Sequence, residues 1–266
     1  MTEHSGLDAL PLWLFMALTV ALLVLAVEVG YRAGIVRGRR SEYERQAPID
    51  AVVGPVMGLL AFMLAVIFSA AVSRYDTRKQ FVLDEANAIA TADLRAQLLP
   101  EPHRSELRAL LREYVDVRVQ GARDTTQLKQ AVTRSEQLHA LLWSRAASMG
   151  QEVPGGDRSA FLSTLVEVIT LHKKRLNAAI HNRLHAPIWF ALFGLAVLAM
   201  AVLGYRAGVS ERRSLVAVVT MAFAFSTVIL LVADLDRPGA GVIRVSQQAM
   251  LDLQQELRDP TSVHAP

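Results

Sequence analysis

Four long apolar stretches constrain what this chain can fold into more than any other feature of its sequence. They cover residues 12–29, 51–72, 188–203 and 215–233. An α-helix rises about 1.5 Å per residue, so roughly 18 to 20 apolar residues cross the hydrocarbon core of a bilayer. Buried helices of soluble proteins rarely stay apolar over this length. We therefore expect a polytopic membrane protein with four transmembrane helices.

The composition agrees with a chain that segregates apolar and charged residues. Hydrophobic residues make up 52% of the sequence and charged residues 20%. The net charge of +3 comes from arginines beside the apolar stretches, with no dense basic stripe and no nucleic-acid motif, so we expect no nucleic-acid partner. The chain has no cysteine, which excludes disulfides and thiolate catalysis. We find no catalytic triad, nucleotide motif or cofactor signature, and predict no enzyme activity and no cofactor.

The expected fold class is all-α, because the segments between the apolar stretches carry apolar residues at helical spacing. The second apolar stretch meets no helix breaker before Pro100, which predicts one long helix from the membrane into a charged segment. A short helix is expected from about Ser246. The predicted order is a first transmembrane hairpin, an amphipathic helical soluble insert, a second transmembrane hairpin and a C-terminal tail, at 1–72, 73–186, 187–233 and 234–266.

The string GYRAG occurs twice, after the first and after the third apolar stretch. Aromatic and basic residues favour the two edges of a bilayer. Spacings of about 24 to 27 Å along each helix predict interface anchors at Trp13, Tyr31, Arg32, Trp189, Tyr205 and Arg206. Gly34 and Gly208 are predicted to end their helices. The repeat indicates either a duplicated hairpin or independent selection of similar interface residues.

Charges leave the sidedness of the chain open. Arginines in the loops after the first and third stretches favour a cytoplasmic position for those loops and termini outside. Basic residues at the other ends of the four stretches are about as numerous, however, and oppose that assignment.

A stripe of small residues runs along the second apolar stretch at helical steps. It consists of Gly54, Gly58, Ala61, Ala65, Ser69 and Ser73. Small residues allow close helix packing, and small hydroxylated residues can also line a pore. We keep both interpretations.

Charged residues cluster at the ends of the apolar stretches and in the segment after the second one. The candidates for a charged network are Glu28, Arg74, Arg78, Asp84, Glu85, Asp93, Arg95, Asp234, Asp236 and Arg237. Their spacing does not allow neat pairs within one helix, so we expect ion pairs with other helices, a Glu28–Arg32 pair, and local capping by Asp234 and Asp236. His181 and His185 have the spacing of two metal ligands on one helix face, but no third ligand accompanies them, so no metal site is predicted.

Four strings resemble the bestrophin-like family of bacterial membrane proteins. They are FSAAVSRYDTRKQFVLDEANAIATADLRAQLLP, PEPHRSELRALLREYVDVR, LGYRAG and LLVADLDRPGAGVIRVSQQAMLDL, and together they extend the resemblance over about residues 54–253. The family usually has Gly-Thr-Ala where this chain has Ala90-Thr91-Ala92. The resemblance implies four spans and a helical insert. The more distant true bestrophins are pentameric anion channels with both termini and the insert in the cytoplasm.

The sequence thus predicts a homo-oligomeric integral protein of the bacterial cytoplasmic membrane that conducts small inorganic ions, with the second span lining the path. Its expected partners are the lipid bilayer, further copies of the chain and those ions. The alternative is a non-conducting membrane sensor or scaffold whose helical insert binds a partner.

Overall fold

The structure is a computed structural model that describes residues 10–40, 49–150, 153, 155–180, 184–210, 214–237 and 241–259. Over these residues the chain is helical and contains no strand, as the sequence predicted. The helices are α1 (Leu12–Arg40), α3 (Asp50–Gln97), α4 (His103–Arg123), a 3₁₀ turn η1 (Thr125–Gln127), α5 (Leu128–Ser148), α6 (Gly155–Ile180), α7 (Ala186–Val209), α8 (Leu215–Asp236) and α9 (Gln248–Arg258).

The chain forms two compact units. The first, here called the membrane unit, comprises Met1–Tyr75 and Arg183–Arg244; the second, the helical unit, comprises Asp76–Asn182 and Val245–Pro266. The helix α3 contributes its first part to the membrane unit and its second part to the helical unit, because nothing interrupts it before Gln97. This continuity is the long helix that the sequence predicted.

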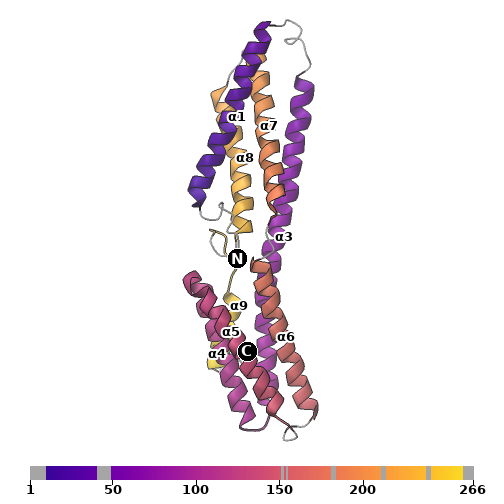
Figure 1. Ribbon diagram of the computed structural model, residues 1–266, viewed down its shortest axis with the longest axis vertical. Coiled ribbons are helices and arrows are strands. Elements are labelled where there is room, and N and C mark those ends of the chain that lie inside the picture. Colours follow the sequence, from indigo (N-terminus) through magenta and orange to yellow (C-terminus); the bar gives the residue numbers. More distant parts are fainter. Residues whose placement is uncertain are drawn as a thin grey trace, which may run out of the picture. The chain divides into compact units, whose positions relative to one another are not determined.

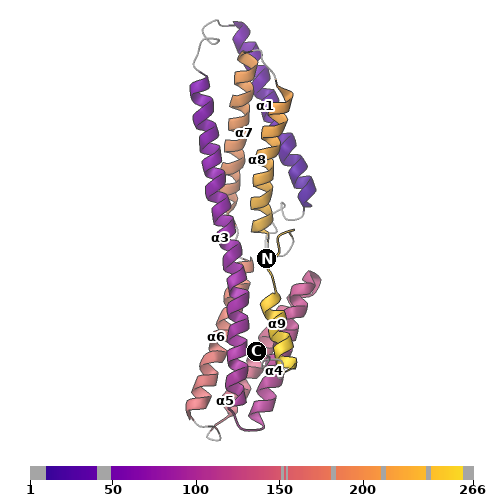
Figure 2. The same ribbon diagram turned by 180° about the vertical axis from the view of Figure 1, so that it is seen from behind.

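In the membrane unit, α1, α7 and α8 run side by side, as both Figure 1 and Figure 2 show. All four predicted spans are helices long and apolar enough to cross a membrane. Each buries one stripe in a common core, and Leu23, Leu60 and Ile229 are fully buried there. The outward sides keep large apolar residues exposed, including Phe62 at 65% and Phe190 at 78%. An apolar exterior of this kind matches a lipid environment, where apolar side chains face hydrocarbon.

The two GYRAG strings pack against each other where α1 meets α7. A Cβ atom on Gly30 would lie 2.0 Å from the carbonyl oxygen of Ala201, and one on Gly204 would lie 2.1 Å from that of Val27. In the same way, a Cβ atom on Gly34 would lie 2.3 Å from the carbonyl oxygen of Tyr205, and one on Gly208 would lie 2.2 Å from that of Tyr31. Any side chain at these positions would separate the two helices, since no real Cβ approaches a carbonyl oxygen so closely.

The predicted role of these glycines as helix ends is therefore wrong for α1. That helix continues past Gly34 to Arg40, and α7 ends at Val209. Among the described residues the glycine with a positive φ is Gly150, at 52°. Gly34 and Gly208 are in the sequence because two parallel helices touch backbone to backbone, the close approach that small residues permit in membranes.

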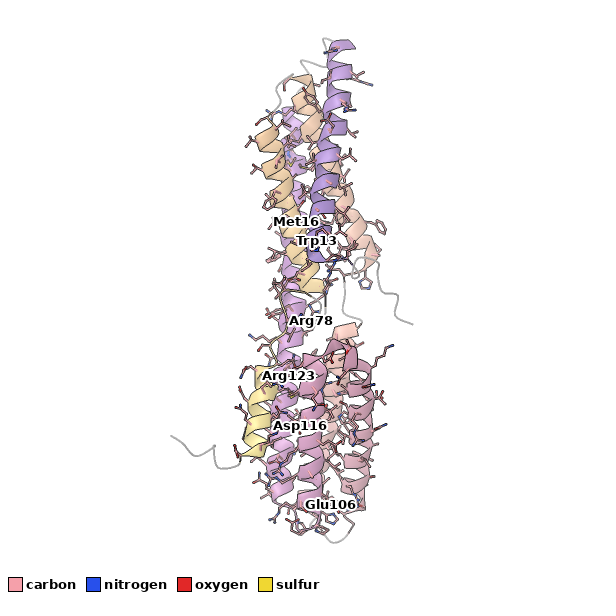
Figure 3. All side chains as sticks on the ribbon, turned by 90° about the vertical axis from the view of Figure 1, so that its left-hand side faces the viewer. Trp13, Met16, Arg78, Glu106, Asp116 and Arg123 are labelled. Atoms are coloured by element: carbon pink, nitrogen blue, oxygen red, sulfur yellow. The ribbon has the colours of Figure 1, made fainter. Side chains whose placement is uncertain are left out.

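The helical unit packs α4, α5, α6 and α9 with the second part of α3 around one apolar core. Fully buried members of that core include Ile89, Leu111, Leu138 and Phe161. In Figure 3, Glu106 and Arg123 mark the two ends of α4, with Asp116 between them. The helix α9, which the sequence assigned to a C-terminal tail, buries Met250, Leu253 and Leu257 in this core.

Candidate functional site

The stripe of small residues on α3 lies on the surface of the described chain. Its members Gly54, Gly58, Ala61, Ala65, Ser69 and Ser73 are all exposed. A Cβ atom added to Gly54 or Gly58 would meet no other atom within 4 Å. Close packing against another helix of the same chain is therefore not what these glycines do in this structure, in contrast to those of α1 and α7.

The opposite side of α3 fixes the orientation of that stripe. Leu60, Leu64, Ile67 and Ala71 are buried in the core of the membrane unit at 0–5% exposure. These residues recur at steps of three and four, so they hold one helical face against the unit and turn the small residues away from it.

Within the helical unit, Glu85 of α3 is completely buried at the centre of a polar cluster. Its carboxylate accepts hydrogen bonds from the Tyr114 hydroxyl at 2.6 Å and from Arg175 at 2.6 Å. Arg118 donates to it at 3.3 Å, and His172 Nδ1 lies 3.7 Å from it. An ionised carboxylate is tolerated in an apolar core only when it is paired and hydrogen-bonded, and four neighbours meet that requirement here.

Two histidines complete this cluster, which we call the Glu85 cluster. His139 of α5 and His172 of α6 are buried at 7% and 1% exposure. Their rings meet edge to face with centroids 4.8 Å apart, and the His139 ring also lies 4.8 Å from that of Tyr114. The Nε2 atoms of both histidines are buried and have no hydrogen-bond partner within the described residues.

Burial and neighbouring charges shift the pKa values in the Glu85 cluster, which lies beyond the apolar stretch of α3. Burial alone would raise the pKa of Glu85, but Arg118, the nearby His172 and Arg175 lower it below its ordinary value. Burial, reinforced by His172, lowers the pKa of His139 from 6.5 to about 4. At neutral pH the cluster therefore holds an ionised Glu85 and a neutral His139.

The other charged candidates on α3 have separate partners. Asp93 forms a two-pronged ion pair with Arg108 of α4, with Nε–Oδ1 at 2.8 Å and the second contact at 3.1 Å. Arg95 donates to Ala160, Ser163 and Thr164 of α6. These contacts agree with the expectation that partners lie on other helices.

Three further candidates on α3 lie outside these interhelical pairs. Asp84 accepts a hydrogen bond from Gln80 of its own helix. Arg78 is buried and Arg74 is half-buried. Of the charged candidates on α3, Glu85 has the most extensive set of partners among the described residues.

The acidic residues at the end of α8 bind backbone groups of other segments. The Asp234 carboxylate accepts the N–H groups of Val242 and Ile243, both at 2.9 Å, and Asp236 accepts that of Leu184 at 2.9 Å. Arg237 donates to the carbonyl oxygen of Leu10 at 2.9 Å. The Asp234 bonds are local, since they reach residues eight and nine positions further along the chain, whereas Asp236 and Arg237 link segments 52 and 227 residues apart.

The predicted interface residues lie at the start and in the second half of α1, and near both ends of α7. Trp13 is 72% exposed at the start of α1, where Figure 3 labels it beside Met16. Trp189 is half-buried and stacks on Phe193. Arg32 and Arg206 are exposed, and Tyr31 and Tyr205 are half-buried. The expected ion pair between Glu28 and Arg32 is present at 2.9 Å.

The structure describes one of the two histidines considered as metal ligands. His185 is exposed just before α7, with no side-chain capping bond. His181 lies outside the described residues. The part of the chain that the structure describes holds no group of three or more His, Cys, Asp or Glu side chains able to bind a metal.

Sequence reasoning missed most of the Glu85 cluster. A usable signal was present: Arg118 follows Tyr114 by four residues on the apolar face of α4, and His139 follows Leu138 among the buried residues of α5. A polar residue on an otherwise apolar helix face is expected to have a buried partner, because an unpaired polar group is costly there.

Comparison with known proteins agrees with this architecture. The family model described as the Bestrophin-like domain matches residues 18–250, which confirms the resemblance seen in the sequence. Two crystal structures of single-residue variants of a bacterial bestrophin homologue from Klebsiella pneumoniae superpose with TM-scores of 0.68 and 0.66. Each is 15% identical and covers 91% of this chain and 98% of its own.

A further crystal structure, of a membrane protein variant, superposes with a TM-score of 0.58 at 14% identity and covers 92% of this chain and 97% of its own. At these identities the superpositions establish the fold. No curated protein matches the sequence.

Proposed function

The chain belongs to the bestrophin-like family, and from this premise we propose that it assembles as a homo-oligomer and conducts small inorganic ions across the bacterial cytoplasmic membrane. The small, partly hydroxylated stripe of α3 lines the conducting path. The family is not one of enzymes, and the four apolar helices make the protein an integral membrane protein.

The observation that carries this proposal is the exposed position of the α3 stripe. The chain buries the aliphatic side of α3 and turns Gly54, Gly58 and Ser69 outward, as part of one exposed stripe that continues along the helix to Ser73. A lipid-facing surface has no need of small or hydroxylated residues. A face shared with further copies of α3 needs them, because small side chains leave room for ions and hydroxyl oxygens can replace part of an ion's water shell.

The absence of cysteine from the chain allows a direct test. Single cysteines replace Ala65 or Ser69, and the full-length protein is reconstituted in liposomes that contain a salt gradient. A water-soluble, charged thiol reagent should react at both positions and reduce ion flux. A matched cysteine replacing Phe223, which is 58% exposed on α8, should neither react at a comparable rate nor change the flux.

The outcomes separate the alternatives. Flux that is absent from the reconstituted wild-type protein at every salt and pH would exclude conduction and favour the sensor or scaffold hypothesis. Flux that persists while Ala65→Cys and Ser69→Cys remain unreactive would place the conducting path elsewhere. The oligomeric state is measured on the same preparation by mass photometry, and a monomer would contradict the shared α3 face.

A further inference from the structure

The Glu85 cluster has no part in the proposed path, yet it places titratable side chains from four helices in the core of the helical unit. Glu85 comes from α3, Tyr114 and Arg118 from α4, His139 from α5, and His172 with Arg175 from α6. Lys173 of α6 adds a further positive charge that acts on His139. A cluster of this kind is more costly than apolar packing, so a role beyond stability is worth seeking.

The hydrogen bonds of the cluster fix where protons lie at neutral pH. Glu85 is ionised and can only accept, so the Tyr114 hydroxyl donates its proton to the carboxylate at 2.6 Å. The Tyr114 oxygen then accepts from His172, whose Nδ1 is 3.1 Å away. The Nε2 atom of His172 is buried and has no hydrogen-bond partner among the described residues.

A proton added to His139 has nowhere favourable to go within the closed helical unit. A protonated imidazole must donate from both nitrogens, and Nε2 of His139 has no acceptor among the described residues. His139 has a second histidine in van der Waals contact, and Arg118, itself buried, already pairs with Glu85 at 3.2 Å. In water, by contrast, a protonated histidine is fully solvated, so acid favours any state in which the core opens.

We propose that His139 acts as a proton-sensing switch in the helical unit, in which acidification releases the packing of α5 against its neighbouring helices. Arg175 extends the effect, because it bonds both Glu85 and the side chain of Gln247, the residue just before α9. Loss of order in the cluster therefore loosens α9 together with α5. This inference depends on the proposed function only for the further expectation that the same acid step changes ion flux.

The direction of the pH effect follows from the His139 pKa. The unfolded or opened chain binds a proton near pH 6.5 and the closed state near pH 4, so stability is complete above pH 6.5 and is lost as the pH falls toward 4. At pH 5 the opening equilibrium of α5 should rise by roughly 30-fold. Glu85 stays ionised in this range because its pKa is lowered, so the response is assigned to His139.

Hydrogen exchange on the full-length protein in lipid nanodiscs tests the switch, with rates at pH 7.5 and pH 5 corrected for intrinsic exchange. In the wild type, the amides of α5 and α9 should lose protection at pH 5 by roughly 30-fold. His139→Phe, which cannot be protonated, should abolish most of the loss. His185→Gln, which removes an exposed histidine of the membrane unit, should respond as the wild type does.

Wild-type α5 with unchanged protection at pH 5 would overturn the proposal, as would a His139→Phe variant with the full acid response. If His139→Phe does not fold, His139→Gln provides a smaller neutral replacement with the same expected outcome. Ion flux is recorded on matched liposomes. An acid response of α5 without any flux would support the switch and contradict conduction, whereas flux without an acid response of α5 would do the reverse.

Discussion

The membrane unit and the helical unit solve the packing of helices in different ways. In the membrane unit, α1 and α7 bring their backbones together at four glycines, and the polar links lie near helix ends, such as Asp234 with Val242. In the helical unit, the helices are separated by Leu, Ile and Phe side chains, and a charged cluster lies in the middle of the core. The two units differ because their solvents differ.

Lipid offers no hydrophobic force between helices, so association there relies on close contact and van der Waals packing. Water drives large side chains into a core, and that core is stable enough to hold an ion cluster. The helix α3 has one part in each unit and shows both kinds of packing. Along its first part it exposes Gly54 and Gly58, and along its second part it buries Val82, Ile89 and Glu85.

The largest effect is expected from removal of the central charge of the helical unit. Glu85→Ala leaves the buried Arg118 and the half-buried Arg175 without their counter-charge and should destabilise the helical unit by about 3–5 kcal/mol. Hydrogen exchange of α4, α5 and α6 in nanodiscs measures the loss, while the amides of α1 and α7 should keep their protection. Glu85→Gln, which keeps the shape of the side chain but removes its charge, serves as the control. Its loss of stability should be smaller than that of Glu85→Ala but still measurable against the wild type.

The next effect concerns the glycine contact of the membrane unit. Gly204→Ala places a methyl group against the Val27 carbonyl oxygen and should destabilise the membrane unit by about 2–3 kcal/mol through overpacking. Gly194→Ala, on the same helix but with nothing within 4 Å of its Cβ, should be neutral or slightly stabilising. Thermal unfolding in detergent measures both variants. Equal melting temperatures would show that the α1–α7 contact tolerates separation.

A smaller effect is expected at the end of α8. Asp234→Asn retains one acceptor oxygen but turns an amide donor toward a backbone N–H, so one of the bonds to Val242 and Ile243 is lost. A cost of about 1–2 kcal/mol follows. The exchange of the amides of residues 242 and 243 should rise while that of α5 stays unchanged. A response confined to α5 would contradict the assignment of this link to the membrane unit.

The smallest effect is expected from an exposed ion pair of the helical unit. Glu113→Ala removes the partner of Arg134, and both side chains are more than 40% exposed. Solvent and salt screen such a pair, so the loss should stay below about 1 kcal/mol. Chemical denaturation of the wild type and the variant measures it. A loss as large as that of Glu85→Ala would mean that burial does not set the strength of these pairs.

Much of the fold followed from sequence patterns. Uninterrupted apolar length predicted the four spans, the absence of a breaker before Pro100 predicted the continuous α3, and helical spacing predicted α4, α5 and α6. These features are local: each depends on neighbours within a few turns of the same helix. The expected pairing of Asp93 with another helix is also seen, though its partner Arg108 was not predicted.

The features that sequence could not supply all depend on which helix faces which. The residues Gly30, Gly34, Gly204 and Gly208 were visible as a repeat, but a glycine that ends a helix and one that touches another backbone look alike in sequence. Tyr114, His139 and His172 lie on three different helices, and only the packing of these helices brings them to Glu85. Sequence alone thus determined that this chain is helical and spans a membrane, because hydropathy and periodicity act locally. The tertiary structure decided which residues meet, because contacts between helices depend on their relative rotation and register.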